Sequence, residues 1–140
     1  MAAFVKYNSF VLELGSAGHN LTSATLKCAL TNTAPAATDT VWAAGTQIPP
    51  TNTNGYTATG NTLTGVTFTQ TSGVAKLIIT DTVFTASGGT LGPFRYAILY
   101  NSTASSKLIG SYDYGSSITL NNTETFTVDF DGANGVLTIT

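Results

Sequence analysis

Apolar residues recur at two different intervals along the chain, and the change of interval separates a short first segment from a long remainder. In the first segment the interval is three or four residues, with apolar side chains at Phe4, Tyr7, Phe10 or Val11, and Leu14. This interval is typical of one face of an α-helix. Gly15 and Gly18 follow and favour the end of a helix. The pattern predicts one short helix over residues 3–14.

From residue 25 onward the interval is two, which is typical of β-strands. In "TLKCALTN" (25–32), Leu26, Cys28 and Leu30 share one face, so we predict a half-buried strand. Further short strands follow, separated by the turn sequences "TSG", "ASGGTLG", "NSTASS", "NNTE" and "DGANG". These strands are "TLTGVTFTQT" (62–71), "VAKLIIT" (74–80), "PFRYAILYN" (93–101), "KLIGSYDY" (107–114), "SITL" (117–120), "TFTVDF" (125–130) and "VLTIT" (136–140).

Short strands at intervals of roughly 8 to 12 residues predict an antiparallel sandwich or barrel. A length of 140 residues is that of one ordinary domain. We therefore expect a mainly β chain that forms a single antiparallel β-sandwich or jelly-roll-like domain over residues 1–140, with one short N-terminal helix. The expected core consists of Leu26, Cys28, Leu30, Phe68, Leu77, Ile79, Tyr96, Ile98, Phe126, Val128 and Phe130.

The segment over residues 33–61 follows neither interval and reads as a long loop, because prolines and glycines stand among Thr, Asn and Ala. Its expected anchors are Val41, Trp42, Ile48 and Tyr56. The stretch "NGYTATG" (54–60) places Tyr56 on a turn shaped by glycine. The ring is either a rigid anchor on a neighbouring molecule or a pin that holds its own loop to the core.

Charge is unusually scarce, since Asp, Glu, Lys and Arg make up 9% of the chain against roughly 25% in ordinary soluble domains. The five basic residues are scattered and the formal net charge is −2, so we expect no nucleic-acid partner. No apolar run approaches the roughly 18 residues of a membrane span, so no membrane partner is expected. The N-terminus lacks the pattern of a secretory signal, and the single cysteine agrees with a reducing compartment. We expect synthesis in the cytoplasm.

Two residues with reactive side chains occur once each, and both have a structural interpretation. His19 lies between Gly18 and Asn20, where a capping or turn-stabilising role is favoured over catalysis. Cys28 lies on the apolar face of its predicted strand, so it is expected to pack in the core as a small hydrophobic side chain.

The stretch "DFDGANG" (129–135) is the best candidate for a cation site, because Asp129, Asp131 and Asn134 supply hard oxygen atoms on a tight loop. It lacks a terminal bidentate carboxylate, and carboxylates that enter a hairpin turn are the favoured interpretation. Whether these three residues bind a cation is left open.

Arg95, the only arginine, stands in the aromatic strand "PFRYAILY". Alternation places Phe94 with Tyr96 on one face and Arg95 with Ala97 on the other. Arg95 is expected to form a salt bridge or a stack, and an interface role is the alternative.

The remaining motifs carry little information. Asn-x-Ser/Thr sequences start at Asn20, Asn101 and Asn121, and a chain rich in Asn and Thr contains them by chance. The sequence "GNTLTG" (60–65) and the pair Gly88-Gly89 do not lie between a strand and a helix, so a phosphate-binding loop is not predicted. We assign no catalytic, cofactor-binding or metal-binding residue, and we expect no cofactor and no enzymatic activity.

Several uncommon stretches occur together in one order: "HNLTSATLKCALTNTAP", "NTNGYTATG", "GPFRYAILYN", "KLIGSYDYGSSITL" and "ETFTVDFDGANGVLTIT". In this succession, which covers nearly the whole chain, the sequence resembles a family of small virion structural proteins of tailed bacteriophages. It departs from the family pattern at "GYTATG", where Ala58-Thr59 replaces a more frequent small-Gly pair, and at "SYDYG", where Ser111-Tyr112 replaces paired tryptophans. No catalytic residues are carried over from the family.

The resemblance implies a structural component of the virion, made in the host cytoplasm. Its expected role is that of a capsid decoration (cement) protein, which binds the assembled lattice of the major capsid protein as a homo-oligomer, with a trimer favoured. The alternative is a tail or head–tail accessory protein, including a fibre-associated component. The loop over residues 33–61 is the expected arm for contact with the capsid.

Overall fold

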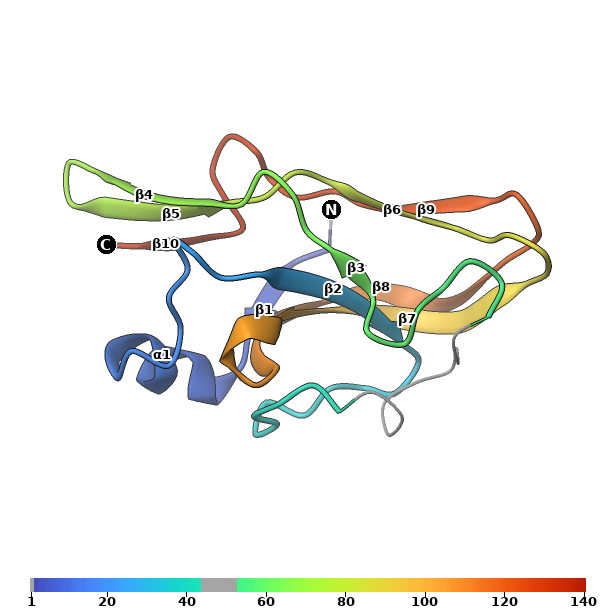
Figure 1. Ribbon diagram of the computed structural model, residues 1–140, viewed down its shortest axis with the longest axis horizontal. Coiled ribbons are helices and arrows are strands. Elements are labelled where there is room, and N and C mark those ends of the chain that lie inside the picture. Colours follow the sequence, from blue (N-terminus) through green and yellow to red (C-terminus); the bar gives the residue numbers. More distant parts are fainter. Residues whose placement is uncertain (1, 44–52) are drawn as a thin grey trace.

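The computed structural model describes residues 2–43 and 53–140 of the chain. The chain is mainly β, and its antiparallel strands form two layers, as in a β-sandwich (Figure 1). The predicted fold class is therefore confirmed. The described elements are β1 (Phe4–Lys6), α1 (Asn8–Gly15), β2 (Leu26–Thr31), β3 (Asn61–Thr62), β4 (Thr67–Thr71), β5 (Val74–Ile78), β6 (Thr82–Thr85), β7 (Leu91–Asn101), the 3-10 helix η1 (Ser102–Ala104), β8 (Lys107–Leu120), β9 (Thr125–Val128) and β10 (Leu137–Ile139).

The first layer is a five-stranded sheet in the order β1-β8-β7-β2-β3, and all its neighbours pair antiparallel. The long strands β7 and β8 form its centre and are joined by η1. The strands predicted over residues 107–114 and 117–120 are both parts of β8. β1 is short, so it covers only part of the outer edge of β8.

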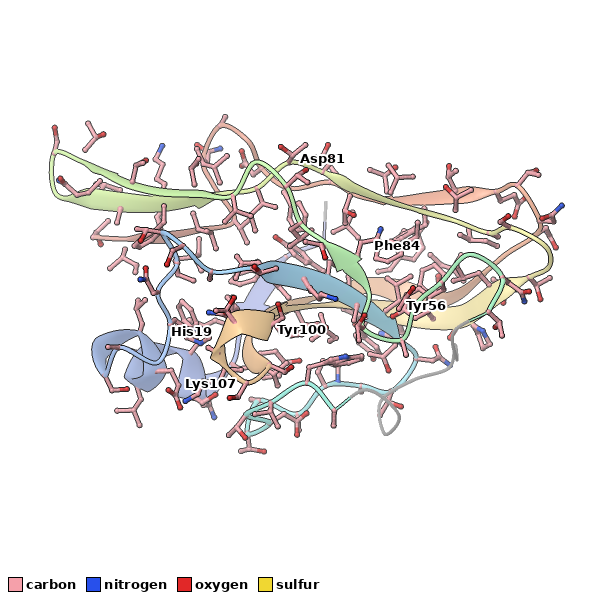
Figure 2. The ribbon with its side chains drawn as sticks, viewed as in Figure 1. His19, Tyr56, Asp81, Phe84, Tyr100 and Lys107 are labelled. Carbon is pink, nitrogen blue, oxygen red and sulfur yellow. The ribbon has the colours of Figure 1, made fainter. Side chains whose placement is uncertain are left out.

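The second layer consists of two small sheets, β10-β5-β4 and β6-β9. β5 pairs with β10 and β6 pairs with β9. Because β6 follows β5 and β10 follows β9 along the chain, the two sheets continue one antiparallel pair, which is interrupted between β9 and β10. Asp81 bridges the interruption, because its carboxylate accepts a hydrogen bond from the Phe130 amide at 2.8 Å (Figure 2). Sequence reasoning missed β6, whose apolar residues Val83 and Phe84 are adjacent instead of alternating.

The main core lies between the two layers and contains most of the predicted side chains. Of the predicted set, the buried members in this core are Leu26, Cys28, Leu30, Leu77, Ile79, Val128 and Phe130. Ile98 is also buried but belongs to a second core on the other face of the first sheet. Phe68, Tyr96 and Phe126 are half-buried. Burial of large aliphatic side chains of this kind contributes about 1.5–3 kcal/mol each relative to exposure, which makes this core the main source of stability.

A second, smaller core lies on the other face of the first sheet. Tyr7, which precedes α1, and Trp42 pack there against Ala29 and Ile98. Figure 1 shows α1 and the segment near residue 40 on this side of the sheet. β2 is therefore buried on both faces, and the prediction of a half-buried strand was wrong. Small residues at the second face, such as Ala29, gave no apolar signal in the sequence.

The predicted helix over residues 3–14 was right only in its second part. α1 begins at Asn8, and Phe4–Lys6 forms β1 instead, with Phe4 opposite Tyr112 of β8. The Phe4 and Tyr112 rings lie 5.4 Å apart, so the strand gains an aromatic cross-strand contact. A short helix is marginally stable without tertiary packing. Residues 4–6 instead form backbone hydrogen bonds with the edge of β8.

The predicted loop over residues 33–61 contains, in its described parts, two isolated β-bridges, and β3 begins at its last residue. Trp42 and Tyr56 are buried, as predicted for anchors. Val41 is 45% exposed, so its predicted role as an anchor was wrong. The backbone of Val41 pairs with Lys107 while its side chain faces outward. Ile48, the fourth predicted anchor, lies outside the described residues.

Candidate binding cleft

An open cleft of about 200 Å³ lies between β9 of the second layer and β7 and β8 of the first. We call it the aromatic cleft, because five of its lining residues are aromatic. It is lined by Ala2, Phe94, Arg95, Tyr96, Ala97, Tyr112, Tyr114, Phe126, Thr127, Val128 and Asp129. A largely apolar hollow with a few polar groups at its rim is the usual form of a binding site.

A bulge in β8 shapes the mouth of the aromatic cleft. Tyr96 lies opposite Asp113 and Phe94 lies opposite Ile118, so residues 114–117 of β8 face only Arg95 of β7. Gly115 has a φ of +97°, a conformation that suits glycine. Bulges of this kind re-aim side chains, and they commonly occur next to functional sites.

The same irregularity corrects the predicted faces of β7. Phe94 packs in the main core together with Ala97, whereas Tyr96 packs against the second core. Strict alternation had placed Phe94 with Tyr96, and this was wrong because the register shifts between the two residues. The shift brings Phe94 into the aromatic cleft.

The rings of the aromatic cleft contact one another at their edges. Phe94 and Phe126 have centroids 5.0 Å apart at 66°, and Tyr114 and Phe126 have centroids 5.7 Å apart at 82°. Such edge-to-face pairs contribute about 0.5–1.5 kcal/mol beyond their burial. Phe94 is buried, Phe126 is half-buried and Tyr114 is 57% exposed. The exposure of the rings therefore increases from the floor of the cleft, at Phe94, to its rim, at Tyr114.

Arg95, which lines the cleft, forms a bidentate ion pair with Asp113, with nitrogen–oxygen distances of 2.7 and 2.8 Å. The Asp113 carboxylate also accepts a hydrogen bond from the Gly115 amide at 2.8 Å. The Arg95 hydrogen bonds, followed by that of Gly115, hold the pKa of Asp113 below its usual value. The guanidinium lies 5.3 Å from the centre of the Tyr96 ring. Both predicted structural roles of Arg95, the salt bridge and the stack, are confirmed.

His19 is 4% exposed, and its side chain is enclosed between α1 and β7 instead of capping a surface turn. Its Nδ1 atom lies 3.3 Å from Nδ2 of Asn101, and its ring lies 5.3 Å from that of Phe10. Its amide does close the turn after α1, since it donates to the Glu13 carbonyl at 3.1 Å. Burial lowers the pKa of His19, and nearby Glu13 acts in the opposite direction. Figure 2 shows His19 in the interior, near Lys107, which pairs with Glu13.

Cys28 is buried between the layers, as predicted. Burial raises the pKa of its thiol to about 12, so the reactive thiolate is disfavoured near neutral pH. The interpretation as a core side chain is confirmed.

The loop over residues 129–135, the candidate for a cation site, is stabilised by its own side chains. The Asp131 carboxylate accepts hydrogen bonds from the amides of Ala133 and Asn134 at 3.0 and 2.8 Å. The side-chain amide of Asn134 also donates to it at 2.8 Å, so Asn134 directs a donor, not an oxygen atom, toward Asp131. These hydrogen bonds, that of the Asn134 amide first, lower the pKa of Asp131. Asp129 instead lines the aromatic cleft.

Tyr56 is 3% exposed and pins its own loop to the core. Its hydroxyl accepts a hydrogen bond from the Leu30 amide at 2.8 Å and lies 3.3 Å from the Leu30 carbonyl, to which it donates. Its ring lies 5.9 Å from that of Phe84, and Figure 2 shows the two side by side. Burial raises the pKa of Tyr56. The alternative, an anchor on a neighbouring molecule, was wrong for this residue.

The Asn-x-Ser/Thr sites differ in exposure. Asn101 is 1% exposed and caps η1, since its side chain accepts from the Thr103 and Ala104 amides. Asn20 and Asn121 are exposed and form local hydrogen bonds. Among the described residues, no group of three or more His, Cys, Asp or Glu side chains is placed to hold a metal ion.

Sequence reasoning did not identify the aromatic cleft. Most of its residues come from β7, β8 and β9, and they meet only because β9 packs over the bulge. One local signal was present: in "SYDYGSS" (111–117), Gly115 interrupts a run of β-forming residues two positions after Asp113, which is typical of a bulge.

Comparison with known proteins adds no relative: no family model, curated protein or solved structure matches this chain. Among the described residues, no helix combines the length and apolar character needed to cross a membrane.

Proposed function

We propose that this chain is a bacteriophage virion structural protein, and specifically a capsid decoration protein that binds the assembled lattice of the major capsid protein and stabilises it. The observation that carries the proposal is the aromatic cleft on a charge-poor β-sandwich. Tyrosine and arginine are enriched among the residues that dominate protein interfaces, and both occur at its rim. The resemblance to small phage virion proteins supports the proposal that the partner in this contact is a phage capsid.

The polar groups of the chain support a structural role over a catalytic one. His19 and Cys28 are buried, and Asp113 and Asp131 are engaged in the bulge and the turn that they stabilise. An acid–base site needs such groups to converge at an accessible position. The accessible site that we describe is instead a mostly aromatic surface, which fits recognition of a partner.

The aromatic cleft, and not the long loop, is the surface that we propose for contact with the capsid. Trp42 and Tyr56 of the loop are directed into the protein itself. Tyr114 lies at an open rim and its ring is free to contact a partner. A tyrosine adds contact area at a small cost in side-chain entropy, since it has few rotatable bonds.

A homotrimer is the proposed assembly. Scarce charge permits close association of copies, and three moderate contacts in one rigid unit gain effective concentration on the lattice. A protein that binds only the assembled shell stabilises that shell by mass action. The proposed location is the virion.

The test adds the purified protein to undecorated mature shells and follows their rupture temperature together with the bound copy number. The proposal predicts saturable binding in stoichiometric proportion to the lattice and a higher rupture temperature. Firm binding to isolated tails without binding to shells would replace the decoration role by the tail or head–tail role. Binding to neither particle would contradict the proposal as a whole.

A further inference from the structure

The outer edge of β9 has unused backbone hydrogen-bonding groups beside the aromatic cleft. In an antiparallel pair, bonded and non-bonded positions alternate. The Ala86 amide donates to the Glu124 carbonyl at 2.9 Å, so the next bonded position on β9 is Phe126. Thr125 and Thr127 are the non-bonded positions. Their N–H and C=O groups are therefore directed away from β6, toward the outer edge.

The opposite edge of the same small sheet is protected. On the outer side of β6, the side-chain amide of Asn61 donates to the Val83 carbonyl at 2.9 Å and to the Thr82 hydroxyl at 3.1 Å. Among residues 2–43 and 53–140, no strand pairs with the outer edge of β9. Proteins normally cover or blunt such edges because an open edge is a template for another strand.

The aromatic cleft begins directly at this open edge, since Phe126, Thr127 and Val128 line it. A strand added next to β9 would place every second side chain toward the first layer. A volume of about 200 Å³ accommodates one large apolar side chain in the cleft, whose lining includes Phe94 and Tyr114. Thr127 supplies the backbone groups at the centre of this contact.

The charges at the rim select the partner's flanking residues. Arg95 is paired with Asp113, so the two charges offset each other. Asp129 also lines the cleft and adds a negative charge. The rim therefore carries a net negative charge, which favours a basic residue and disfavours an acidic one in the bound segment.

We propose that the β9 edge and the aromatic cleft together bind an extended peptide segment by strand addition. The segment carries one large apolar side chain for the cleft and, three residues away, a Lys or Arg for Asp129, which lies three residues from Phe126. Main-chain hydrogen bonds supply affinity and the cleft supplies specificity, as in other cases of strand addition. In the decoration role the segment belongs to the major capsid protein, and this identification rests on the proposed function. The strand addition itself does not.

The first test uses a blocked, fluorescent heptapeptide, Lys-Thr-Thr-Phe-Thr-Thr-Lys, and measures its binding by anisotropy. Thr127→Pro removes an outward N–H that β6 does not use, so the fold is retained while one edge hydrogen bond is lost. Thr127→Val is the matched control, because it keeps the N–H. We expect about tenfold weaker binding for the proline variant and unchanged binding for the valine variant. Equal binding by both variants would overturn the proposal.

The second test keeps the proposal falsifiable even if Thr127→Pro fails to fold. Tyr114→Ser removes an exposed wall of the cleft and should weaken peptide binding at a temperature where the variant is fully folded, although loss of its edge contact with Phe126 lowers the melting temperature slightly. Replacing both peptide lysines by glutamates should weaken binding to the native protein, and Asp129→Asn should reduce that preference. No peptide binding, together with binding of a neutral oligosaccharide or dimerisation through β9, would overturn the proposal in favour of those occupants.

The two proposals fail in different ways. If the native protein binds shells and Thr127→Pro binds them equally well, strand addition is wrong while the decoration role stands. If the peptide binds as expected and no shell binds, the decoration role is wrong while strand addition stands.

Discussion

The two long sides of the sandwich use aromatic residues in opposite ways. On the closed side, near β2, β3 and β6, Tyr56 is buried and hydrogen-bonded, and Asn61 covers the edge of β6. On the open side, near β8 and β9, Tyr114 is exposed and the edge of β9 lacks a neighbour among the described strands. The difference separates residues that stabilise the fold from residues that are free to bind. Substitutions on the closed side should affect stability, and those on the open side should affect binding.

The largest effect is expected at Gly60 on the closed side. Gly60 has a φ of +71°, and a Cβ atom there would collide with the backbone carbonyl of Cys28 in β2. Gly60→Ala should therefore lower the free energy of unfolding by about 3 kcal/mol or more, because backbone strain and a clash add. Urea unfolding followed by fluorescence measures this. Gly73→Ala is the control, since Gly73 has a similar φ of +84° but an added Cβ atom would have no neighbour within 4 Å. This control measures the contribution of backbone strain without a clash.

A smaller effect on the same side is expected for Tyr56→Phe. The substitution leaves the buried Leu30 amide without its hydrogen-bond acceptor, which should cost about 1–3 kcal/mol. Tyr114→Phe is the matched change on the open side and should alter stability by less than about 0.5 kcal/mol. An equal loss of unfolding free energy in the two variants would contradict the assignment of Tyr56 to a stabilising side and of Tyr114 to a binding side.

The pH dependence of stability distinguishes buried from exposed titratable groups. Because burial lowers the pKa of His19, the folded state resists protonation of this residue. The resulting stability is present above the unfolded pKa of about 6.5 and is lost as the pH falls through the lower folded pKa. Melting temperatures from pH 7.5 to pH 4.5 should therefore fall more for the native chain than for His19→Gln. Glu13 and Lys107, which lie near His19, are unchanged in both proteins. Parallel curves would contradict this assignment.

The smallest effect is expected for Asp113→Asn at the open rim. Its depressed pKa means that the pair with Arg95 stabilises the folded state above the unfolded pKa of about 3.9, and this contribution is lost as the pH falls further. Exposed pairs are weak, so the variant should be only slightly less stable at pH 7 and equal to the native chain near pH 2. Asp129→Asn controls for loss of one negative charge at the aromatic cleft. If the variant were still less stable than the native chain at pH 2, Asp113 would stabilise the fold through an interaction that does not depend on its charge.

Much of the fold was predictable because it follows from local alternation. The face of β2 that carries Leu26, Cys28 and Leu30 was predicted, as was the burial of Trp42. The errors arose where pairing between distant segments decides the structure. Residues 4–6 have helical spacing, yet they pair with β8, about a hundred residues away along the chain.

The candidate site was less predictable for the same reason. A single arginine among aromatics was a visible signal, and its ion pair and stack were anticipated. The partner, Asp113, and the register shift beside Phe94 depend on how β7 and β8 pair. Alternation along β7 contains no information about a bulge in β8. The aromatic cleft therefore could not be predicted from the sequence pattern and was found only in the structure.

The central claim is that the open side is the binding side, and one paired measurement tests it most directly. Thermal stability and binding to undecorated shells are measured for Tyr56→Phe and Tyr114→Ser under the same conditions. The account predicts that Tyr56→Phe melts at the lower temperature and binds shells normally below that temperature. Tyr114→Ser loses only its edge contact with Phe126, so it melts closer to the native chain, and it binds shells more weakly while fully folded. Native shell binding by Tyr114→Ser, with binding lost in folded Tyr56→Phe, would contradict it.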